Sequence, residues 1–357
     1  MRILIATDAW YPQVNGVVRT LSALAKAIEG FGATIDFLTP EGMPSVGLPS
    51  YPGIRLALPT PRKISQQIKA LRPDAIHIAT EGPIGHFVRW HCRARRRPFT
   101  TSFHTRFADY AVARWPIPEE AIWSWLRWFH NAGRGTMAAT PSLAEELSSR
   151  GFRSVMRWPR GVDSNLFKPR PKKDLGVKAP IFLTVGRLAV EKNLEAFLAL
   201  DLPGSKIVVG EGPARDGLVQ RFPDAIFLGH KEGEELAAIY ASADVFVFPS
   251  RTDTFGLVLL EALSSGIPVA ALPSPATRDV VGAAPVAVLD EDLRAACLAA
   301  LTLSHAACLD YAKTMTWEAS AQCFLTNLTQ SGVYPSREDF TGGGVSSQST
   351  TSTARFA

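Results

Sequence analysis

Apolar residues along the chain form short runs that alternate with stretches of helical spacing. Residues 2–7 form the first run, and apolar residues then recur at three- and four-residue intervals from Leu21 to Ile28, where glycines end the pattern. Short apolar runs separated by helical segments are typical of parallel strands covered by helices on both faces. The sequence therefore predicts a doubly wound α/β fold, with further strands at 74–78, 99–103, 181–185, 206–209 and 244–248.

The stretch at 250–270 carries the strongest local signal. A strand is followed by a loop that contains Asp253 and by helical spacing over 255–265, with Gly256 at the helix start. Glycine allows a ligand to approach the backbone closely, and the N–H groups at a helix start bind anions. Glu261 lies roughly 6 to 7 Å along the helix from its start, which is the scale of a nucleoside diphosphate. Acids on both sides of an anion site predict a sugar nucleotide; an amphipathic helix with a solvated carboxylate is the alternative.

This stretch resembles the E-x7-E signature of the retaining nucleotide-sugar glycosyltransferases of family 4, which have the GT-B fold. Asp253 stands in the place of the first glutamate, and Glu261 in the place of the second. The resemblance implies that Asp253 acts near the donor sugar and that Glu261 binds the ribose hydroxyls. It also implies that the donor lies against the neighbouring backbone at Thr254, Phe255, Gly256 and Leu257.

A second motif follows the predicted strand at 181–185. Gly186, Arg187 and Lys192 resemble the family's G-R-x-x-x-x-K-G segment, with Asn193 in the place of the last glycine. The resemblance implies that Arg187 and Lys192 hold the donor diphosphate. Negative charge builds up on a nucleoside diphosphate as it leaves a sugar, and fixed cations stabilise that charge without a metal ion. Ordinary surface arginine and lysine residues are the alternative.

Gly210 and Gly212, followed by Pro213, resemble the family's G-x-G-P turn, which implies a place in the donor site. An NAD-dependent oxidoreductase with a dinucleotide fingerprint is the alternative from another enzyme class. The next predicted strand, at 225–229, ends without the acidic residue that an NAD ribose requires. A non-catalytic nucleotide-binding protein is a further alternative.

The amino-terminal half carries three more motifs of this family. Asn15 and Gly16 open a helix after the first strand, similar to the loop that touches donor phosphate and acceptor. His104 and Arg106 follow a predicted strand, similar to the motif whose histidine lies beside the sugar-transfer centre. Arg160 begins a turn similar to the N-G-V-D turn at the cleft edge, with arginine replacing asparagine. A glycine before a helix and a lone histidine also occur for structural reasons alone.

The formal charge of +5 is unevenly distributed. Residues 1–165 contain 21 Lys and Arg against 12 Asp and Glu, which is a formal charge of +9. Between 89 and 130, arginines are mixed with tryptophans, a composition that suits the bilayer interface, nucleic acid or ordinary packing. No known nucleic-acid module is visible, so we expect no nucleic-acid partner. We place the acceptor or membrane side at Asn15, Arg95, Arg96, Arg97, Arg106, Trp115 and Trp123.

Neither a membrane span nor a metal site is predicted. No run of about eighteen apolar residues occurs, and the chain starts with a strand rather than a signal peptide. The four cysteines are widely spaced without C-x-x-C, and the D-x-D at 290–292 predicts a helix cap. We therefore expect a cytoplasmic protein, held at the inner face of the membrane only peripherally, that needs neither metal nor cofactor.

The resemblance implies a GT-B enzyme with two Rossmann-like domains facing a cleft. It implies transfer of a sugar, with retained stereochemistry, from a UDP- or GDP-sugar to an acceptor. The arginines and tryptophans between 89 and 130 predict that this acceptor is a membrane lipid such as diacylglycerol; a soluble or polysaccharide acceptor is the alternative. The predicted division is an acceptor-side domain at 1–168, a donor-binding domain at 169–315, a helix at 316–335 that crosses back, and a disordered tail at 336–357.

Overall fold

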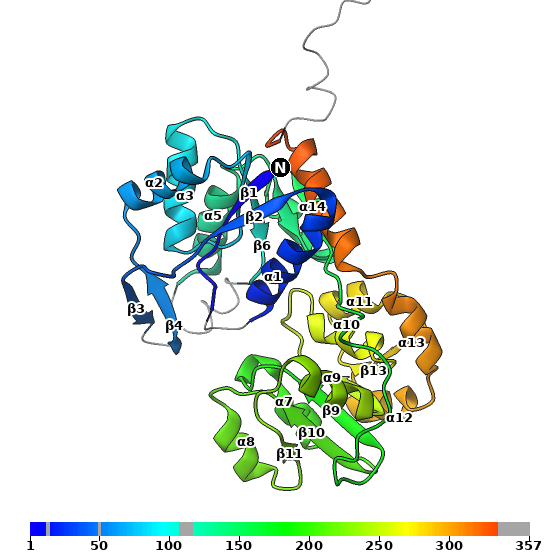
Figure 1. The fold of residues 1–357 in the computed structure, drawn as a ribbon. Coiled ribbons are helices and arrows are strands. Elements are labelled where there is room, and N and C mark those ends of the chain that lie inside the picture. The colour runs from blue at the N-terminus through cyan, green and yellow to red at the C-terminus, as the bar shows by residue number, and fades with distance from the viewer. Residues whose placement is uncertain (12–14, 49–50, 107–116, 335–357) are drawn as a thin grey trace, which may run out of the picture.

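The protein folds into two α/β domains, each built on a six-stranded parallel sheet (Figure 1). The computed structural model describes residues 1–11, 15–48, 51–106 and 117–334. The predicted tail at 336–357 and the call on Trp115 therefore lie outside the described residues. The two parallel sheets confirm the predicted doubly wound α/β fold class.

The amino-terminal sheet has the strand order β2-β1-β5-β6-β7-β8. The order reverses between β1 and β5, and ligands of such sheets bind at the carboxyl ends of the strands near this point. The strands are β1 (Arg2–Ala6), β2 (Thr34–Leu38), β5 (Ala75–Ile78), β6 (Thr100–Phe103), β7 (Thr136–Ala138) and β8 (Val155–Arg157), and β3 (Ser45–Leu48) pairs with β4 (Tyr51–Ala57) in an antiparallel hairpin. The helices are α1 (Gly16–Ile28), α2 (Pro61–Leu71), α3 (Pro83–Ala94), α5 (Glu119–His130) and α6 (Pro141–Ser149), with the 3-10 helix η1 (Glu29–Phe31).

The carboxyl-terminal sheet repeats this plan with the order β11-β10-β9-β12-β13-β14 and reverses between β9 and β12. Its strands are β9 (Ile181–Val185), β10 (Ser205–Val209), β11 (Ile226–Phe227), β12 (Val245–Phe248), β13 (Val269–Ala271) and β14 (Ala287–Leu289). Its helices are η2 (Val190–Lys192), α7 (Leu194–Leu198), α8 (Arg215–Arg221), α9 (Gly233–Ser242), α10 (Leu257–Ser264), α11 (Pro275–Val281), α12 (Leu293–Ala300) and α13 (His305–Ala312).

Each sheet is buried on both faces, as its continuous apolar runs predict. In the amino-terminal domain, Ile3 and Ile5 contribute to one core and Leu4 to the core on the opposite face. In the carboxyl-terminal domain, Leu183 contributes to one core and Phe182 to the core on the opposite face. Alternate strand residues point to opposite faces, so a strand that is apolar throughout needs helices on both sides.

The last helix, α14 (Trp317–Gln330), packs on the amino-terminal domain although it follows the carboxyl-terminal one (Figure 1). Phe324 and Leu328 are fully buried in the same core as Ile3 and Ile5. The chain thus passes between the domains twice, and its final helix completes the core of the domain in which the chain began.

Within the described ranges, no single helix is long and apolar enough to cross a membrane. Taken together, α12 and α13 have the length and composition of a membrane span, but the chain bends by 97° at the break between them.

Candidate active site

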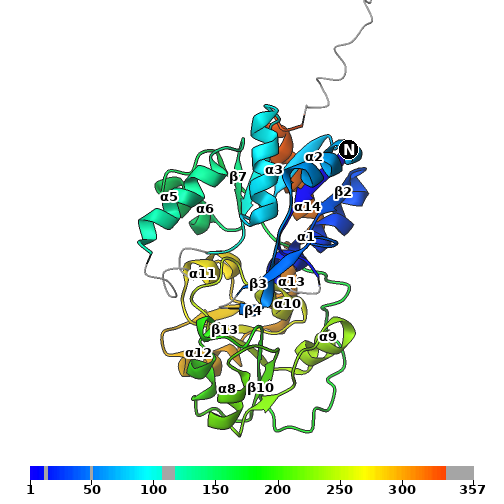
Figure 2. The same ribbon diagram turned by 90° about the vertical axis from the view of Figure 1, so that its left-hand side faces the viewer.

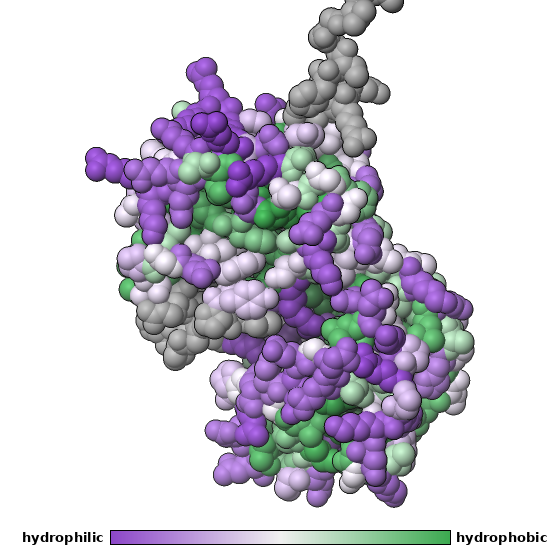
Figure 3. Space-filling view, in the orientation of Figure 1, coloured by the Kyte–Doolittle hydropathy of each residue, from purple (hydrophilic) through white to green (hydrophobic). Residues whose placement is uncertain are grey.

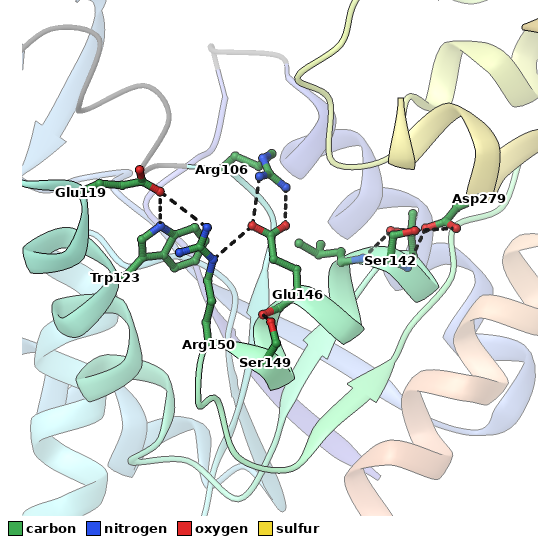
Figure 4. A network of polar contacts seen from close by, with 10 residues as sticks. Arg106, Glu119, Trp123, Ser142, Glu146, Ser149, Arg150 and Asp279 are labelled. Atoms are coloured by element: carbon green, nitrogen blue, oxygen red, sulfur yellow. Dashed lines mark hydrogen bonds and ion pairs between the residues drawn. The ribbon is translucent and has the colours of Figure 1, made fainter. Parts of the chain in front are cut away.

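The two domains meet through loops that follow the carboxyl ends of their strands. Thr254, after β12, donates its hydroxyl to the carbonyl oxygen of His104, after β6, at 2.9 Å. Ser142, at the start of α6, donates its N–H and its hydroxyl to the carboxylate of Asp279 on α11, at 2.8 and 3.0 Å (Figure 4). Hydrophilic side chains gather where the domains meet (Figure 3). These contacts bring the sequence-predicted donor residues opposite the predicted histidine.

Asp253 and Lys192 form an ion pair between the loop after β12 and η2. Their side chains are 18% and 24% exposed. The oxygen Oδ2 of Asp253 is buried and has no hydrogen-bond partner among the described residues. Buried polar atoms in folded proteins nearly always have a partner. This oxygen is therefore available to a hydroxyl group of a bound ligand.

Asn193 keeps the backbone conformation that a glycine would have at this position. Its φ is +52°, in the left-handed region that asparagine adopts more readily than other residues with a Cβ. Its side-chain amide donates to the carbonyl oxygen of Pro249 at 3.2 Å. The departure from the family pattern therefore preserves the turn that carries Lys192.

The glycines near Arg187 have two different surroundings. A Cβ added to Gly186 would meet no atom within 4 Å, and the Arg187 side chain is exposed. A Cβ added to Gly210 would lie 1.9 Å from the carbonyl oxygen of Gly186, and one added to Gly212 would lie 2.3 Å from that of Leu188. Gly210 and Gly212 thus allow the loop after β10 to pack on the backbone that carries Arg187. Their contact with the donor stays a prediction.

The start of α10 has the geometry that the motif predicts for an anion site. Gly256 caps the helix with φ +87°, and Phe255 and Leu257 beside it are partly buried. The first N–H groups of a helix have no partner within it. Glu261, one turn further on, is only 4% exposed. Its oxygens are held by the Arg19 guanidinium and by the hydroxyl of Tyr240, which donates to Oε2 at 3.0 Å.

His104 is held as a neutral imidazole. Nη2 of Arg160 lies 3.4 Å from its Nδ1. Burial, reinforced by the charge of Arg160, holds the pKa of His104 well below its ordinary value. Because a guanidinium can only donate, Nδ1 accepts and the hydrogen is on Nε2, which is buried without a partner among the described residues. His104 thus presents an N–H donor.

Arg160 itself is 4% exposed and stacks on Trp158, with its Cζ 4.2 Å from the ring centroid. Burial lowers the pKa of Arg160 to about 9. The family has asparagine at this place, so the tautomer of His104 depends here on a cation.

One residue that the sequence places on the acceptor or membrane side, Trp123, is buried, and three others lie away from the cleft. The side chain of Trp123 is fully buried, and its Nε1 donates to Glu119 at 2.9 Å (Figure 4). Arg95, Arg96 and Arg97 come after the end of α3, which starts at the carboxyl end of β5 and runs back along the sheet. Twelve helical residues span roughly 18 Å, and α3 runs away from the carboxyl-terminal domain (Figure 2), so the arginines that follow it lie away from the cleft. Their contact with a membrane stays a prediction.

The other amino-terminal candidates lie near the cleft. Asn15 caps α1 by accepting from the N–H groups of Val17 and Val18 at 2.9 and 3.1 Å, and a Cβ at Gly16 would meet no atom within 4 Å. Arg106 makes a bidentate ion pair with Glu146 at 2.7 and 3.1 Å (Figure 4). Their roles toward an acceptor stay predictions.

Sequence reasoning missed Arg19 and Tyr240, the two residues that hold Glu261. Arg19 is 242 positions away from Glu261, and Tyr240 is 21 positions away. The position of Arg19, in the first turn of a helix that opens after β1, is the one signal that could have identified it. In the ranges that the structure describes, no group of three or more His, Cys, Asp or Glu residues could hold a metal ion.

Two family models match the chain, one on each domain. Glycosyltransferase Family 4 matches residues 14–166, and Glycosyl transferases group 1 matches residues 179–305. Among solved structures, Anabaena HepE in complex with UDP and glucose has a TM-score of 0.69 at 16% identity, over 92% of this chain and all of the other. These matches favour the glycosyltransferase interpretation over the NAD-dependent oxidoreductase.

Two curated relatives extend the match. The chain is 31% identical over 308 residues to a GDP-mannose-dependent alpha-mannosyltransferase of Mycolicibacterium smegmatis, covering 79% of this chain and 82% of the relative. It is 27% identical to an alpha-monoglucosyldiacylglycerol synthase of Streptococcus pneumoniae, covering 79% and 73%. The chain belongs to the family 4 glycosyltransferases, also described as glycosyl transferases group 1, and has their GT-B fold.

Proposed function

We propose that this glycosyltransferase moves a sugar, with retention and without a metal ion, from a UDP- or GDP-sugar to the hydroxyl of a membrane lipid such as diacylglycerol. The observation that carries the donor part is the arrangement of Lys192, Asp253 and Glu261 around the start of α10. The enzyme acts in the cytoplasm at the surface of the membrane, without a cofactor.

The cations beside α10 stabilise the leaving group. As the bond between sugar and diphosphate breaks, charge accumulates on the β-phosphate, and the motif assigns Arg187 and Lys192 to that phosphate. The helix start adds N–H donors and the positive end of the helix dipole. Charges held in place before the reaction cost no reorganisation when it occurs, so this site performs with protein groups what a metal ion does in other transferases.

Asp253 and His104 position the donor sugar. The unpartnered Oδ2 of Asp253 accepts a sugar hydroxyl, and the unpartnered Nε2–H of His104 donates to another sugar oxygen. His104 is kept neutral by burial and by Arg160, so it acts as a hydrogen-bond donor and not as a charged acid. Glu261 accepts the ribose hydroxyls at the other end of the donor.

The names of the relatives support a lipid acceptor. One relative is a glucosyldiacylglycerol synthase, and another is a phosphatidylinositol dimannoside mannosyltransferase, at 26% identity over 96% of that protein. Several relatives have GDP-mannose in their names, and HepE binds UDP, so the proposed donor is either a GDP-sugar or a UDP-sugar.

Incubation with radiolabelled UDP- and GDP-sugars and with vesicles that contain diacylglycerol is expected to give a labelled lipid and a free nucleoside diphosphate. EDTA should leave the rate within about twofold, because fixed cations stabilise the leaving group. The product's anomeric configuration, measured by NMR, should match that of the donor. Transfer to a soluble sugar with none to lipid would contradict the acceptor, and loss of activity in EDTA restored by manganese would contradict the metal-free site.

A basic groove on the amino-terminal domain supports contact with an anionic membrane. The groove has a volume of about 710 Å³, and Trp128, at 55% exposed, lines it together with five arginines. Arg93 and Arg153 have no acidic partner among the described residues, and Trp90, three residues before Arg93 on α3, is 53% exposed. Exposed indoles beside unneutralised cations suit the bilayer interface. The groove is lined by Arg89, Arg93, Arg127, Trp128, Asn131, Ala132, Arg150, Gly151 and Arg153.

Replacing Arg93 and Arg153 by glutamine is expected to weaken binding to anionic vesicles by about ten- to thirtyfold, since each cation near an anionic leaflet contributes about 1 kcal/mol. The matched control replaces Arg95 and Arg96, which are exposed at the end of α3 and carry the same charge. Sedimentation with vesicles of phosphatidylglycerol and of phosphatidylcholine measures the effect. Equal losses in both variants would mean that net charge, and not the groove, determines binding.

A further inference from the structure

A single ion pair joins the two domains among the described residues, and it involves the acid assigned to the ribose. Nη2 of Arg19 on α1 contacts Oε1 of Glu261 on α10. The two helices approach each other across the cleft, with α1 pointing its amino-terminal end at the carboxyl-terminal domain (Figure 1). Arg19 therefore belongs to the opposite domain from the donor motifs, yet contacts their second acid.

Glu261 is buried beside this contact. Its side chain is 5% exposed, whereas that of Arg19 is 36% exposed. A buried carboxylate without a counter-charge is strongly unfavourable. The other neighbour, Tyr240, is a neutral donor: burial raises its pKa well above the ordinary value for tyrosine. Arg19 is thus the cation that compensates the charge of Glu261.

The arrangement also leaves Glu261 able to bind a ligand. Each carboxylate oxygen has about two acceptor positions, and each is used once, by Arg19 and by Tyr240. The remaining positions can accept from a diol such as the 2′ and 3′ hydroxyls of a ribose. A hydrogen bond to a charged acceptor is about twice as strong as one to a neutral acceptor, so a carboxylate held in place by Arg19 suits a ribose diol.

We propose that Arg19 is a positioning residue for the donor, which acts through Glu261 by pairing with its carboxylate and orienting it toward the ribose hydroxyls from the opposite domain. This inference rests on the proposed function, since it requires a nucleotide donor. It makes the affinity for the nucleotide depend on the contact between the domains. By linkage, a bound ribose in turn favours the arrangement in which α1 lies against α10.

The test measures binding of UDP and GDP, and of their 2′,3′-dideoxy forms, to the full chain by calorimetry. Arg19→Gln is expected to weaken binding of the better nucleotide about tenfold. It should change binding of the dideoxy form by less than twofold, because that form has no hydroxyl for Glu261 to accept. In a Glu261→Gln background, Arg19→Gln should have no further effect. In turnover, Arg19→Gln should raise the donor KM and leave kcat within about twofold.

Two controls separate this role from a general loss of structure. Arg221→Gln removes a cation from an exposed ion pair with Glu195 and should leave binding unchanged. Arg19→Lys keeps the charge and should retain most of the affinity. It keeps the proposal testable if Arg19→Gln melts at a lower temperature than the parent, because a loss in Arg19→Lys as large as in Arg19→Gln would contradict a role through charge.

Equal weakening for ribose and dideoxy forms would overturn the role of Arg19, because it would mean a phosphate contact or a structural effect. Unchanged binding of the ribose form would overturn it as well. If the parent bound neither UDP nor GDP, the proposed function would fail, and the role of Arg19 with it. If Glu261→Gln bound the nucleotide as the parent does while Arg19→Gln did not, Arg19 would act on the donor without Glu261, and the inference would be wrong.

Discussion

Replacing Lys192 by alanine is expected to slow sugar transfer by two to three orders of magnitude, with the fold intact. Removing one fixed charge that stabilises a developing anion typically costs about 2 to 4 kcal/mol of transition-state stabilisation. Lys192 also pairs with Asp253, so its removal leaves that partly buried carboxylate without a counter-charge. Because the interaction strengthens as charge builds up on the leaving group, kcat should fall more than KM rises.

The measurement is release of nucleoside diphosphate under steady-state conditions, with the donor that the labelled panel identifies. Arg187→Ala tests the second cation, whose side chain is exposed. Lys231→Ala is the matched control, because Lys231 pairs with Glu235 on the surface of the same domain. Turnover within about threefold of the parent in both Arg187→Ala and Lys192→Ala would contradict leaving-group stabilisation.

The fold was predictable because its signals are local. A strand that is apolar throughout, such as β12, must be covered on both faces, and this requirement leads directly to helices on both sides of a parallel sheet. The loop and helix around Asp253 and Glu261 were predictable for a similar reason. The end of the strand, the glycine and the start of the helix all lie within about twenty residues of one another in the sequence.

The contacts of the candidate site were less predictable, because they join residues that are distant in sequence. No local pattern links Arg19 to Glu261, or Arg160 to His104. Trp123 illustrates a different limit: helical spacing shows that α5 has two faces, but both carry tryptophan, and Trp123 is buried whereas Trp128 is exposed. The place of Arg95 away from the cleft follows from local geometry, since a helix that follows a strand ends at the opposite edge of the sheet.

A buried histidine on β5 provides a test of the amino-terminal fold itself. His77 on β5 is fully buried, with Nδ1 2.8 Å from the hydroxyl of Thr100 and Nε2 3.0 Å from that of Ser102. Burial, and then the nearby charge of Arg160, lowers the pKa of His77 to about 3. A neutral imidazole satisfies both hydroxyls by donating with one nitrogen and accepting with the other.

We expect the protein to lose stability as the pH falls from about 6.5 toward 3, in part because of His77. In this window the unfolded chain binds a proton at His77 and the folded chain does not, so the free energy of unfolding decreases with decreasing pH. One proton bound only in the unfolded state costs about 1.4 kcal/mol per pH unit. Between pH 6.5 and 4.5, His77 alone should therefore remove about 2 to 3 kcal/mol of stability.

Urea unfolding of the parent and of His77→Gln at both pH values measures this contribution. Tryptophan fluorescence is a suitable probe, because seven of the eight tryptophans precede residue 160 and report on the amino-terminal domain. Glutamine can donate and accept but does not titrate, so the variant should be less stable at pH 6.5 and should lose about 2 to 3 kcal/mol less on acidification.

Other titrating groups cancel when the change in stability between the two pH values is compared between the two proteins. Asp8 is one such group: burial raises its pKa to about 6, and its effect on stability has the opposite sign. His230→Gln, which removes an exposed imidazole, should keep the parent's pH dependence. The same pH dependence in His77→Gln as in the parent would mean that the core around β5 admits a proton, and that the neutral state inferred for His77 is wrong.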